Sequence, residues 1–392
     1  MNEHKVYLDN AATTSISNEV LKEMMPYLTE NYGNTNSLHS FGRNTAEALT
    51  KARDRVAEAI GANSNEIYFT SGGTEANNWA IIGIAEANQE KGKHIITSQI
   101  EHSSVLSACK VLESRGFKVT YLPVDKYGLV SMSELMQHLT RETILVSIMS
   151  ANNEIGTIQS INAIASIAKE RGSIFHTDCV QATGLLDINV NNIQIDAMTI
   201  SSHKLHGPKG AGALYIRRGV KIAPLIVGGS QEHNLRAGTI NTPAIVGFGV
   251  AISIAKRDLD VNVEKITKLR NYFINRILTE IEDTSLNGHP NQRLANNISI
   301  TFNNINGEAL LIMLDMAGIA VSTGSACSVG STELPYTLLA LKLTLEQAKS
   351  TIRFSLDVST SKEEIDYTME KLIVCVKKLR TISPLVKIKG GK

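Results

Sequence analysis

The sequence predicts an α/β protein in which a mostly parallel central sheet is followed by a smaller α+β unit. From about Asn18 to Ala255, helical patterns alternate with short apolar runs such as residues 144–149. This alternation is typical of a parallel sheet that is covered by helices on both faces. The chain has 392 residues, of which 43% are hydrophobic, so it can bury a large core and is long enough for two domains.

The second part of the chain predicts the smaller unit. A helix at 243–256 closes the alternating section, and the polar stretch 257–260 marks a boundary. The patterns that follow are a long helix at 263–282, a strand at 297–302, a helix at 308–316, a strand around Arg353 and a final helix that opens with a capping box at 361–364. We therefore predict a large domain at 15–257 and a small domain at 258–392, which residues 1–14 join.

Composition narrows the classes of function. The formal net charge of +1 creates no field that would gather nucleic acid. No apolar run is long enough to span a membrane, and no apolar signal segment is present. The four cysteines have the spacing of neither a zinc site nor a disulfide framework, which indicates a reducing compartment. We expect a soluble, cytoplasmic protein with no intrinsic metal and no direct contact with nucleic acid or membrane.

The stretch 201–210 follows the apolar run 195–200 and combines a lysine with hydroxyls, a histidine and glycines. Enzymes that use pyridoxal phosphate (PLP) hold the cofactor through a Schiff base to a lysine, for which Lys204 is the candidate. Ser201 and His203 are available to the phosphate. The alternative is a solvated lysine in a loop, so the interpretation depends on the rest of the site.

A phosphate site is predicted at the start of a helix. The strand-like run 66–70 ends in serine, glycine and threonine residues, and a helical pattern follows over 76–87. The N–H groups of a helix N-terminus attract an anion, and glycines allow it to approach closely. Gly73 and Thr74 are therefore candidate cofactor contacts. An ordinary threonine-capped helix start is the alternative.

Two further strand ends carry candidate residues. An apolar strand at 174–178 ends in Asp178, whose charge can keep the pyridine nitrogen of the cofactor protonated, and Gln181 could donate to the phenolate oxygen. The alternative role for Asp178 is a helix cap. His102 opens a helical pattern at the sheet edge where open α/β proteins place their ligands. Its imidazole can stack on the pyridine ring and move protons near neutral pH.

These motifs, in this order, resemble the class V aminotransferase-like enzymes and, within them, the cysteine desulfurases of the NifS and IscS kind. The resemblance covers nearly the whole chain, and its specific segments are 6–14, 71–78, 101–106, 152–159, 201–215, 236–241 and 322–328. It implies the PLP-dependent transferase fold of type I, PLP as the cofactor, and an obligate homodimer.

The resemblance also implies a sulfurtransferase that converts L-cysteine into L-alanine. Lys204 would take the Cα proton, and the thiolate of Cys327 would attack the substrate's sulfur to give a persulfide. His102 is the natural candidate to deprotonate that thiol. Small residues at 322–331 predict a mobile loop, which suits a sulfur carrier. The sulfur would pass to an acceptor protein in iron–sulfur cluster assembly or tRNA thiolation, and Cys327 could transiently ligate an iron–sulfur cluster.

Further contacts follow from the same resemblance. Arg353 matches the arginine that binds the substrate's carboxylate in this family. A guanidinium group suits that role because it is permanently charged and can donate two parallel hydrogen bonds. Asn34 and Asn153 are expected to contact the substrate, and Asn153 also the cofactor. Thr239 would reach the phosphate bound by the neighbouring subunit.

The sequence departs from the family pattern at Thr35, Ser230 and His233. These departures affect the expected geometry of the substrate entrance and the expected identity of the sulfur acceptor, and they remove no catalytic group. The other three cysteines are predicted to be buried small hydrophobes, namely Cys109, Cys179 and Cys375.

Alternative functions stay open. They are selenocysteine lysis or another class V reaction, and a non-catalytic sulfur-relay scaffold. The intact set of Lys204, Asp178, His102 and Cys327 argues against a scaffold, and a cysteine in a loop of small residues argues against simple transamination.

Overall fold

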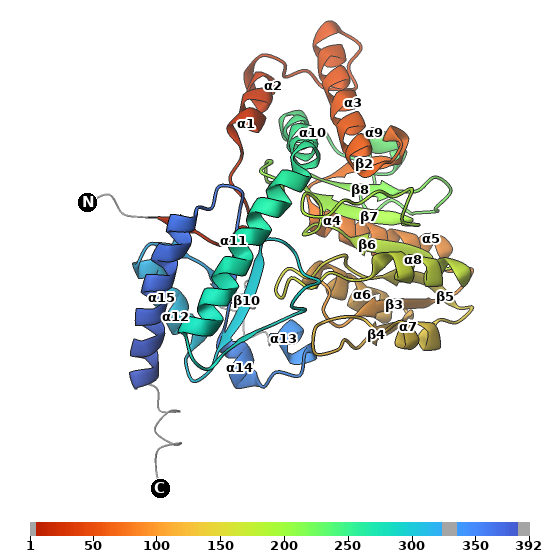
Figure 1. Ribbon diagram of the computed structural model, residues 1–392. Helices are drawn as coiled ribbons and strands as arrows, with labels where there is room; N and C mark the ends of the chain where they lie inside the picture. Colours follow the sequence, from red (N-terminus) through yellow and green to blue (C-terminus); the bar gives the residue numbers. More distant parts are fainter. Residues whose placement is uncertain (1–4, 324–334, 383–392) are drawn as a thin grey trace.

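The computed structural model describes residues 5–323 and 335–382 (Figure 1). Cys327 and part of the segment predicted to carry it lie outside these ranges. In Figure 1 the large sheet with its helices occupies one side of the molecule, and α11, α12 and α15 with β10 occupy the other.

A seven-stranded sheet forms the centre of the large unit, in the order β2-β8-β7-β6-β5-β3-β4. Its strands are β2 (Ile67–Thr70), β3 (His94–Ser98), β4 (Lys118–Leu122), β5 (Thr143–Ser147), β6 (Ile174–Asp178), β7 (Ala197–Ser201) and β8 (Gly212–Ile216). The strands from β7 to β4 are parallel, whereas β8 is antiparallel to both of its neighbours. The predicted mostly parallel sheet is confirmed, and the carboxyl ends of five strands meet at one edge.

Two apolar layers cover the faces of this sheet. Successive strand residues point to opposite faces, so Leu145 and Ala197 pack with α4, α5 and α6, whereas Val146 and Met198 pack with α3, α8 and α10. The helices and turns of this unit are α1 (Asn18–Met24), α2 (Pro26–Thr29), α3 (Ser40–Ile60), η1 (Ser64–Glu66), α4 (Gly73–Asn78), the π-helical η2 (Trp79–Gly83), α5 (Ile84–Asn88), α6 (Ser103–Ser114), α7 (Met132–His138), α8 (Ile161–Glu170), η3 (Ser202–Lys204), α9 (Gln231–Asn234) and α10 (Thr242–Arg257).

The smaller unit is built on a four-stranded sheet in the order β12-β13-β10-β9. Its elements are α11 (Leu259–Glu280), β9 (Thr284–Leu286), β10 (Asn297–Phe302), α12 (Gly307–Met316), β11 (Ile319–Ala320), β12 (Ser322–Thr323), α13 (Tyr336–Ala340), α14 (Leu345–Lys349), β13 (Thr351–Ser355) and α15 (Lys362–Ile382). The predicted capping box of α15 is confirmed, because Ser361 N donates to Glu364 Oε2 at 2.8 Å and Glu364 N to Ser361 Oγ at 3.1 Å.

The N-terminal residues pack with this smaller unit. The strand β1 (Val6–Tyr7) pairs in parallel with β11, and Val6 and Leu8 are buried in the same cluster as the apolar residues of α11, β10, β13 and α15. This packing is what the predicted division at residues 257 and 258 requires, and the division itself stays a prediction. The polar boundary shrinks to Asp258, since α10 ends at Arg257 and α11 begins at Leu259.

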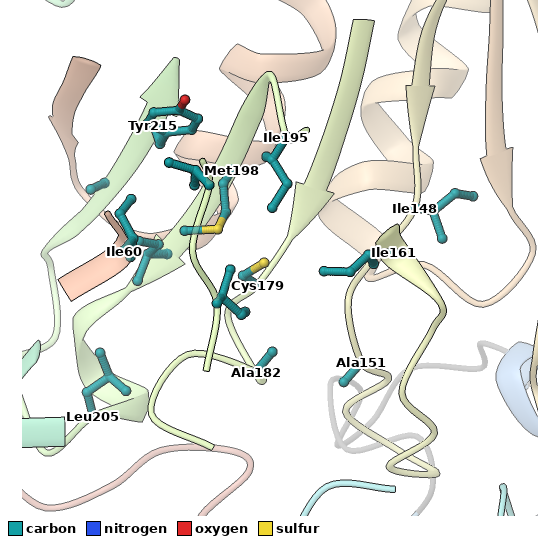
Figure 2. Packing of buried hydrophobic residues seen from close by; sticks show 14 of the residues in the cluster. Ile60, Ile148, Ala151, Ile161, Cys179, Ala182, Ile195, Met198, Leu205 and Tyr215 are labelled. Carbon is teal, nitrogen blue, oxygen red and sulfur yellow. The ribbon is translucent and has the colours of Figure 1, made fainter. Parts of the chain in front are cut away.

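Figure 2 shows how one cysteine packs in the apolar cluster of the large unit. Cys179 lies among Met198, Ile195 and Ala182, and it is fully buried. Cys109 and Cys375 are buried in the other two clusters, so the prediction for these three cysteines is confirmed. Burial raises the pKa of the Cys109 and Cys179 thiols to about 12, and it also raises that of Cys375. These thiols therefore stay protonated at neutral pH.

None of the helices within the described ranges has both the length and the apolar character that crossing a bilayer requires.

Candidate active site at the edge of the large sheet

The candidate residues gather where parallel strands end. Asp178 is the last residue of β6 and Ser201 the last of β7, while Lys204 closes the short turn η3 that follows β7. His102 follows β3 and caps α6. Since β3, β5, β6 and β7 are parallel, their carboxyl ends share one edge of the sheet.

The N-terminus of α4 reaches the same edge. Its cap is Gly72, and no side chain caps it, so the alternative of a threonine-capped start is wrong. A Cβ on Gly73 would lie 2.9 Å from Val180 Cγ2, close enough that Val180 would have to shift, and 3.6 Å from Ser201 Cβ, so the glycine backbone lies close to Ser201. The first N–H groups of the helix are thereby brought beside Ser201, as a phosphate site requires.

Lys204 and Gln181 converge on the N-terminal segment. Lys204 Nζ donates to Ala11 O at 2.6 Å and to Ala12 O at 2.5 Å, and Gln181 Nε2 donates to Ala11 O at 3.0 Å. A shared acceptor places the lysine and glutamine side chains next to each other. The backbone of the N-terminal segment therefore forms one wall of the site.

A chain of hydrogen bonds, which we call the edge network, joins Asp178, Asn77, Ser104 and His102. Asn77 Nδ2 donates to Asp178 Oδ2 at 2.7 Å and to Ser104 Oγ at 2.9 Å. Ser104 Oγ lies 2.7 Å from His102 Nδ1. Burial lowers the pKa of His102, an effect that Asp178 opposes and Lys204 reinforces, so the imidazole is neutral at neutral pH.

His203 follows Ser202 in the turn η3. Its Nδ1 lies 3.1 Å from Thr13 Oγ1, and its backbone carbonyl accepts from Thr14 Oγ1 at 3.0 Å. Burial, together with Lys204 and Lys209, lowers the pKa of His203 to about 4. Any contact of His203 with a phosphate would therefore be a hydrogen bond from a neutral ring. Its predicted role stays a prediction.

Two ion pairs, which we call the seam, lie beside this edge: Arg353 with Asp9, both in the smaller unit, and His206 with Asp357, which joins the two units. Arg353 is 2% exposed, and its Nη2 lies 2.9 Å from Asp9 Oδ1, while Nη1 donates to Asn153 O at 3.2 Å. The predicted substrate contacts Arg353 and Asn153 are thus adjacent, and Arg353 Nε has no partner among the described residues.

The second ion pair of the seam joins His206 Nε2 to Asp357 Oδ1 at 2.8 Å. The bond to Asp357 raises the pKa of His206. Burial would raise the pKa of Asp357, but hydrogen bonds from His206 and Ser359 lower it to about 2. Both residues line a cavity of about 530 Å³ that Lys204 also lines.

Two predicted residues, Asn34 and Thr239, are not brought to this edge by the described structure. Asn34 is exposed, and its Oδ1 accepts from Asn36 N at 3.0 Å. Thr239 is exposed beside Gly238, whose N–H donates to Gln231 Oε1 at 3.1 Å. Cys327 lies outside the described residues. Their roles stay predictions.

Four residues of this region have roles that the motifs did not assign, namely Asn77, Ser104, Asp9 and Glu154. Each lies within a segment that carries the family resemblance, so its polar character was visible, but its partner was not. Burial raises the pKa of Glu154 to about 7, although a 3.0 Å hydrogen bond from Thr337 and the charge of Arg353 oppose that rise.

Comparison with known proteins agrees with this geometry. The aminotransferase class-V family model matches residues 6–368. Cysteine desulfurase IscS of Dictyoglomus turgidum is 52% identical over 97% of this chain and 96% of its own length. The solved structure of a NifS-like protein has a TM-score of 0.91 at 38% identity, covering 96% of this chain and 100% of its own. SspA in complex with cysteine has a TM-score of 0.81 at 36% identity, covering 91% and 100%.

The cofactor of this family is PLP, and the residues at the sheet edge fit it. Asp178 is 5% exposed and accepts from two neutral groups, Asn77 Nδ2 and Val180 N, so a buried negative charge stands ready for a protonated ring nitrogen. The buried Ser202 Oγ and Asn77 Oδ1 also lack partners among the described residues. By sequence, fold and the chemistry of its sheet edge, the chain belongs to the class-V aminotransferase family and, within it, to the cysteine desulfurases of the IscS and NifS kind.

Proposed function

We propose that the protein is a PLP-dependent cysteine desulfurase, which converts L-cysteine into L-alanine and carries the sulfur as a persulfide on Cys327. The observation that carries the proposal is the meeting of Lys204, Asp178 and the His102 segment at one sheet edge, in a chain 52% identical to an IscS cysteine desulfurase.

Each residue at this edge has a proposed role toward the cofactor. Lys204 would hold it covalently, Asp178 would face its ring nitrogen, and Gln181 would donate to its phenolate oxygen. The N-terminus of α4 at Gly73 and Thr74, together with Ser201 and His203, would bind the phosphate. When bound, PLP supplies an electron sink for the substrate's Cα.

The seam would bind the substrate. Arg353 would pair with the carboxylate of cysteine, and Asn153 lies beside it. Lys204 Nζ would then remove the Cα proton. The thiolate of Cys327 would attack the substrate's sulfur, so that an S–S bond forms as the Cβ–S bond breaks. The electron pair of the broken bond stays with the substrate, and protonation completes alanine.

A homodimer is the proposed assembly. Large apolar side chains are exposed along residues 16–41, including Tyr32 at 71% and Leu38 at 91%, and the rings of Tyr32 and Phe41 lie 5.6 Å apart. An apolar surface of this kind marks an interface. In the dimer, Thr239 would reach the phosphate of the neighbouring subunit, and Asn34 would approach a substrate.

The sulfur would leave Cys327 for an acceptor protein. We propose an acceptor in iron–sulfur cluster assembly or tRNA thiolation, in the reducing cytoplasm. Cys327 could ligate a cluster transiently during such a transfer.

The decisive experiment incubates the purified protein with L-cysteine and a thiol reductant. Equal amounts of alanine and sulfide should form. Cys327→Ser should keep the cofactor but form no persulfide, because it lacks the nucleophile, whereas Cys375→Ser should behave as the wild type. Normal desulfuration by Cys327→Ser would contradict the proposal. Alanine formation from selenocysteine but not from cysteine would favour the lyase alternative.

A further inference from the structure

The edge network contains two residues with no assigned role in the reaction, Ser104 and Asn77. Both are buried, at 6% and 1% exposure, and neither reaches the surface through its hydrogen bonds. Buried polar side chains on two packed helices, α4 and α6, require a reason for their placement. The hydrogen-bond directions supply one, because they determine which nitrogen of His102 carries the proton.

The first fixed direction comes from the backbone of α6. Ser104 N donates to His102 Nδ1 at 3.2 Å, which is the capping bond of this helix. A backbone N–H cannot turn away or reverse its role. His102 Nδ1 must therefore offer a lone pair, and a neutral ring then carries its proton on Nε2.

The second direction comes from Asp178. An ionised carboxylate only accepts hydrogen bonds, so the group of Asn77 that lies 2.7 Å from Asp178 Oδ2 must be the NH₂ group. Turning the amide over would place two oxygens against each other. The amide keeps this orientation even though its Oδ1 is buried without a partner in the described structure.

These two directions settle the hydroxyl of Ser104. Its oxygen accepts the second hydrogen of Asn77 Nδ2 at 2.9 Å. With Nδ1 as the acceptor, the Ser104 hydroxyl is the donor across the 2.7 Å to His102 Nδ1, whose lone pair it shares with Ser104 N. Asp178 thus acts on His102 through three hydrogen bonds. The charged groups that act on this ring are Asp178 and Lys204, and the neighbouring buried Glu101 is held by Ser98 Oγ and Met149 N.

We propose that Ser104 and Asn77 are positioning residues that hold neutral His102 with its proton on Nε2, so that the ring atom outside the edge network is a hydrogen donor rather than a base. The consequence for the reaction rests on the proposed function, whereas the tautomer does not. His102 would give a proton at Nε2 instead of taking one from the Cys327 thiol, which is the role that the sequence predicts for it, and the first base in the site would be Lys204.

The test is ¹⁵N NMR of the full-length, cofactor-loaded protein with labelled histidine, in which a His102→Gln variant assigns the resonances. In the wild type, Nε2 should appear as a protonated nitrogen and Nδ1 as an acceptor. Ser104→Ala should move the Nδ1 resonance and let the second tautomer appear, because only the longer backbone bond remains. Ser104→Thr should restore the wild-type pattern, and Ser103→Ala on the same turn is the matched control.

Kinetics supply the second readout. Ser104→Ala should lower kcat about tenfold with little change in KM, less than the roughly hundredfold loss expected when an acid–base group itself is removed. A proton on Nδ1 of wild-type His102, or an Nδ1 resonance identical in the wild type and Ser104→Ala, would overturn this inference. The predicted tautomer in a protein that forms no alanine would instead contradict the proposed function alone.

Discussion

The edge network and the seam are neighbours in space but solve different physical problems. The edge network joins one carboxylate to three neutral side chains, so the negative charge of Asp178 has neutral donors as its hydrogen-bond partners. The seam joins full charges, Arg353 with Asp9 and His206 with Asp357. The carboxylate that would face a cationic ring has neutral hydrogen-bond partners, whereas each carboxylate of the seam is paired with a basic side chain.

This difference predicts how ligands bind at the two places. A cofactor at the sheet edge adds a partner that the protein lacks. A carboxylate at Arg353 meets a guanidinium group that already has an anionic partner in Asp9. Binding at the edge would therefore add a partner for Asp178. Binding at the seam would be an exchange, in which the ligand's carboxylate replaces Asp9 as the anionic partner of Arg353.

The largest expected effect is at the sheet edge. Lys204→Ala should abolish both the visible absorbance of the lysine-bound cofactor and alanine formation, because it removes the amine that would hold the cofactor and take the Cα proton. Absorbance spectra and an alanine assay measure the two losses. Lys209→Ala, an exposed lysine in the same loop, should leave both unchanged. Retained absorbance in Lys204→Ala would show that Lys204 does not hold the cofactor, and the sheet edge could then no longer be contrasted with the seam as the cofactor site.

At the seam, Asp9→Asn should destabilise the protein by about 3 kcal/mol, since it leaves the buried Arg353 without its anionic partner. If binding there is an exchange, alanine should raise the melting temperature of Asp9→Asn more than that of the wild type, because its carboxylate replaces the lost partner. Thermal unfolding with and without alanine tests this. Asp315→Asn, at an exposed site, is the control. Equal stabilisation of both proteins would contradict the exchange.

The smallest effect concerns the other pair of the seam. His206 has a raised pKa, so its contribution is complete below its unfolded value of about 6.5 and is lost as the pH rises through the folded value. Asp357 has a pKa lowered to about 2, so its contribution is complete above about 4 and is lost as the pH falls through about 2.

Asp357→Asn should therefore cost about 1 kcal/mol between about pH 4 and 6.5 and less at about pH 9. Melting curves across this range measure the difference. Asp187→Asn, which removes a surface pair with Lys256, should show no such change between neutral and alkaline pH. A penalty for Asp357→Asn that does not depend on pH would show that the His206 charge has no part in it.

Much of the fold could be predicted from the sequence, because short apolar runs followed by polar residues and glycines mark where strands end. The predicted strand at 297–302 is β10 itself, and the strand ending at Asp178 is β6. The parallel arrangement then places Asp178, Ser201 and the His102 segment at one edge without further information. The apolar helical faces also identified the buried Cys109 and Cys375, and the family resemblance identified Cys179 as a packing residue.

The contacts of the seam could not be predicted in this way. Asp9 and Arg353 are 344 positions apart, and nothing in a local pattern says that the two side chains meet. The edge network could not be predicted from the sequence for another reason. Asn77 and Ser104 stand on ordinary helix starts, and only the close approach of α4 and α6 makes them partners.

The position of the N-terminal segment has a consequence for how the protein is made on the ribosome. Residues 6–8 leave the tunnel long before their partners, since β1 pairs with β11 at residues 319–320, and Leu8 O accepts from Ser355 N at 2.7 Å. The carbonyl groups of Ala11 and Ala12 that contact Lys204 belong to this same segment. Residues 6–7 therefore stay without their β partner until residues 319–320 have been synthesised, and Leu8 O without its donor until residue 355 has been synthesised. A nascent chain can complete its large sheet before this wall of the active site is held in place.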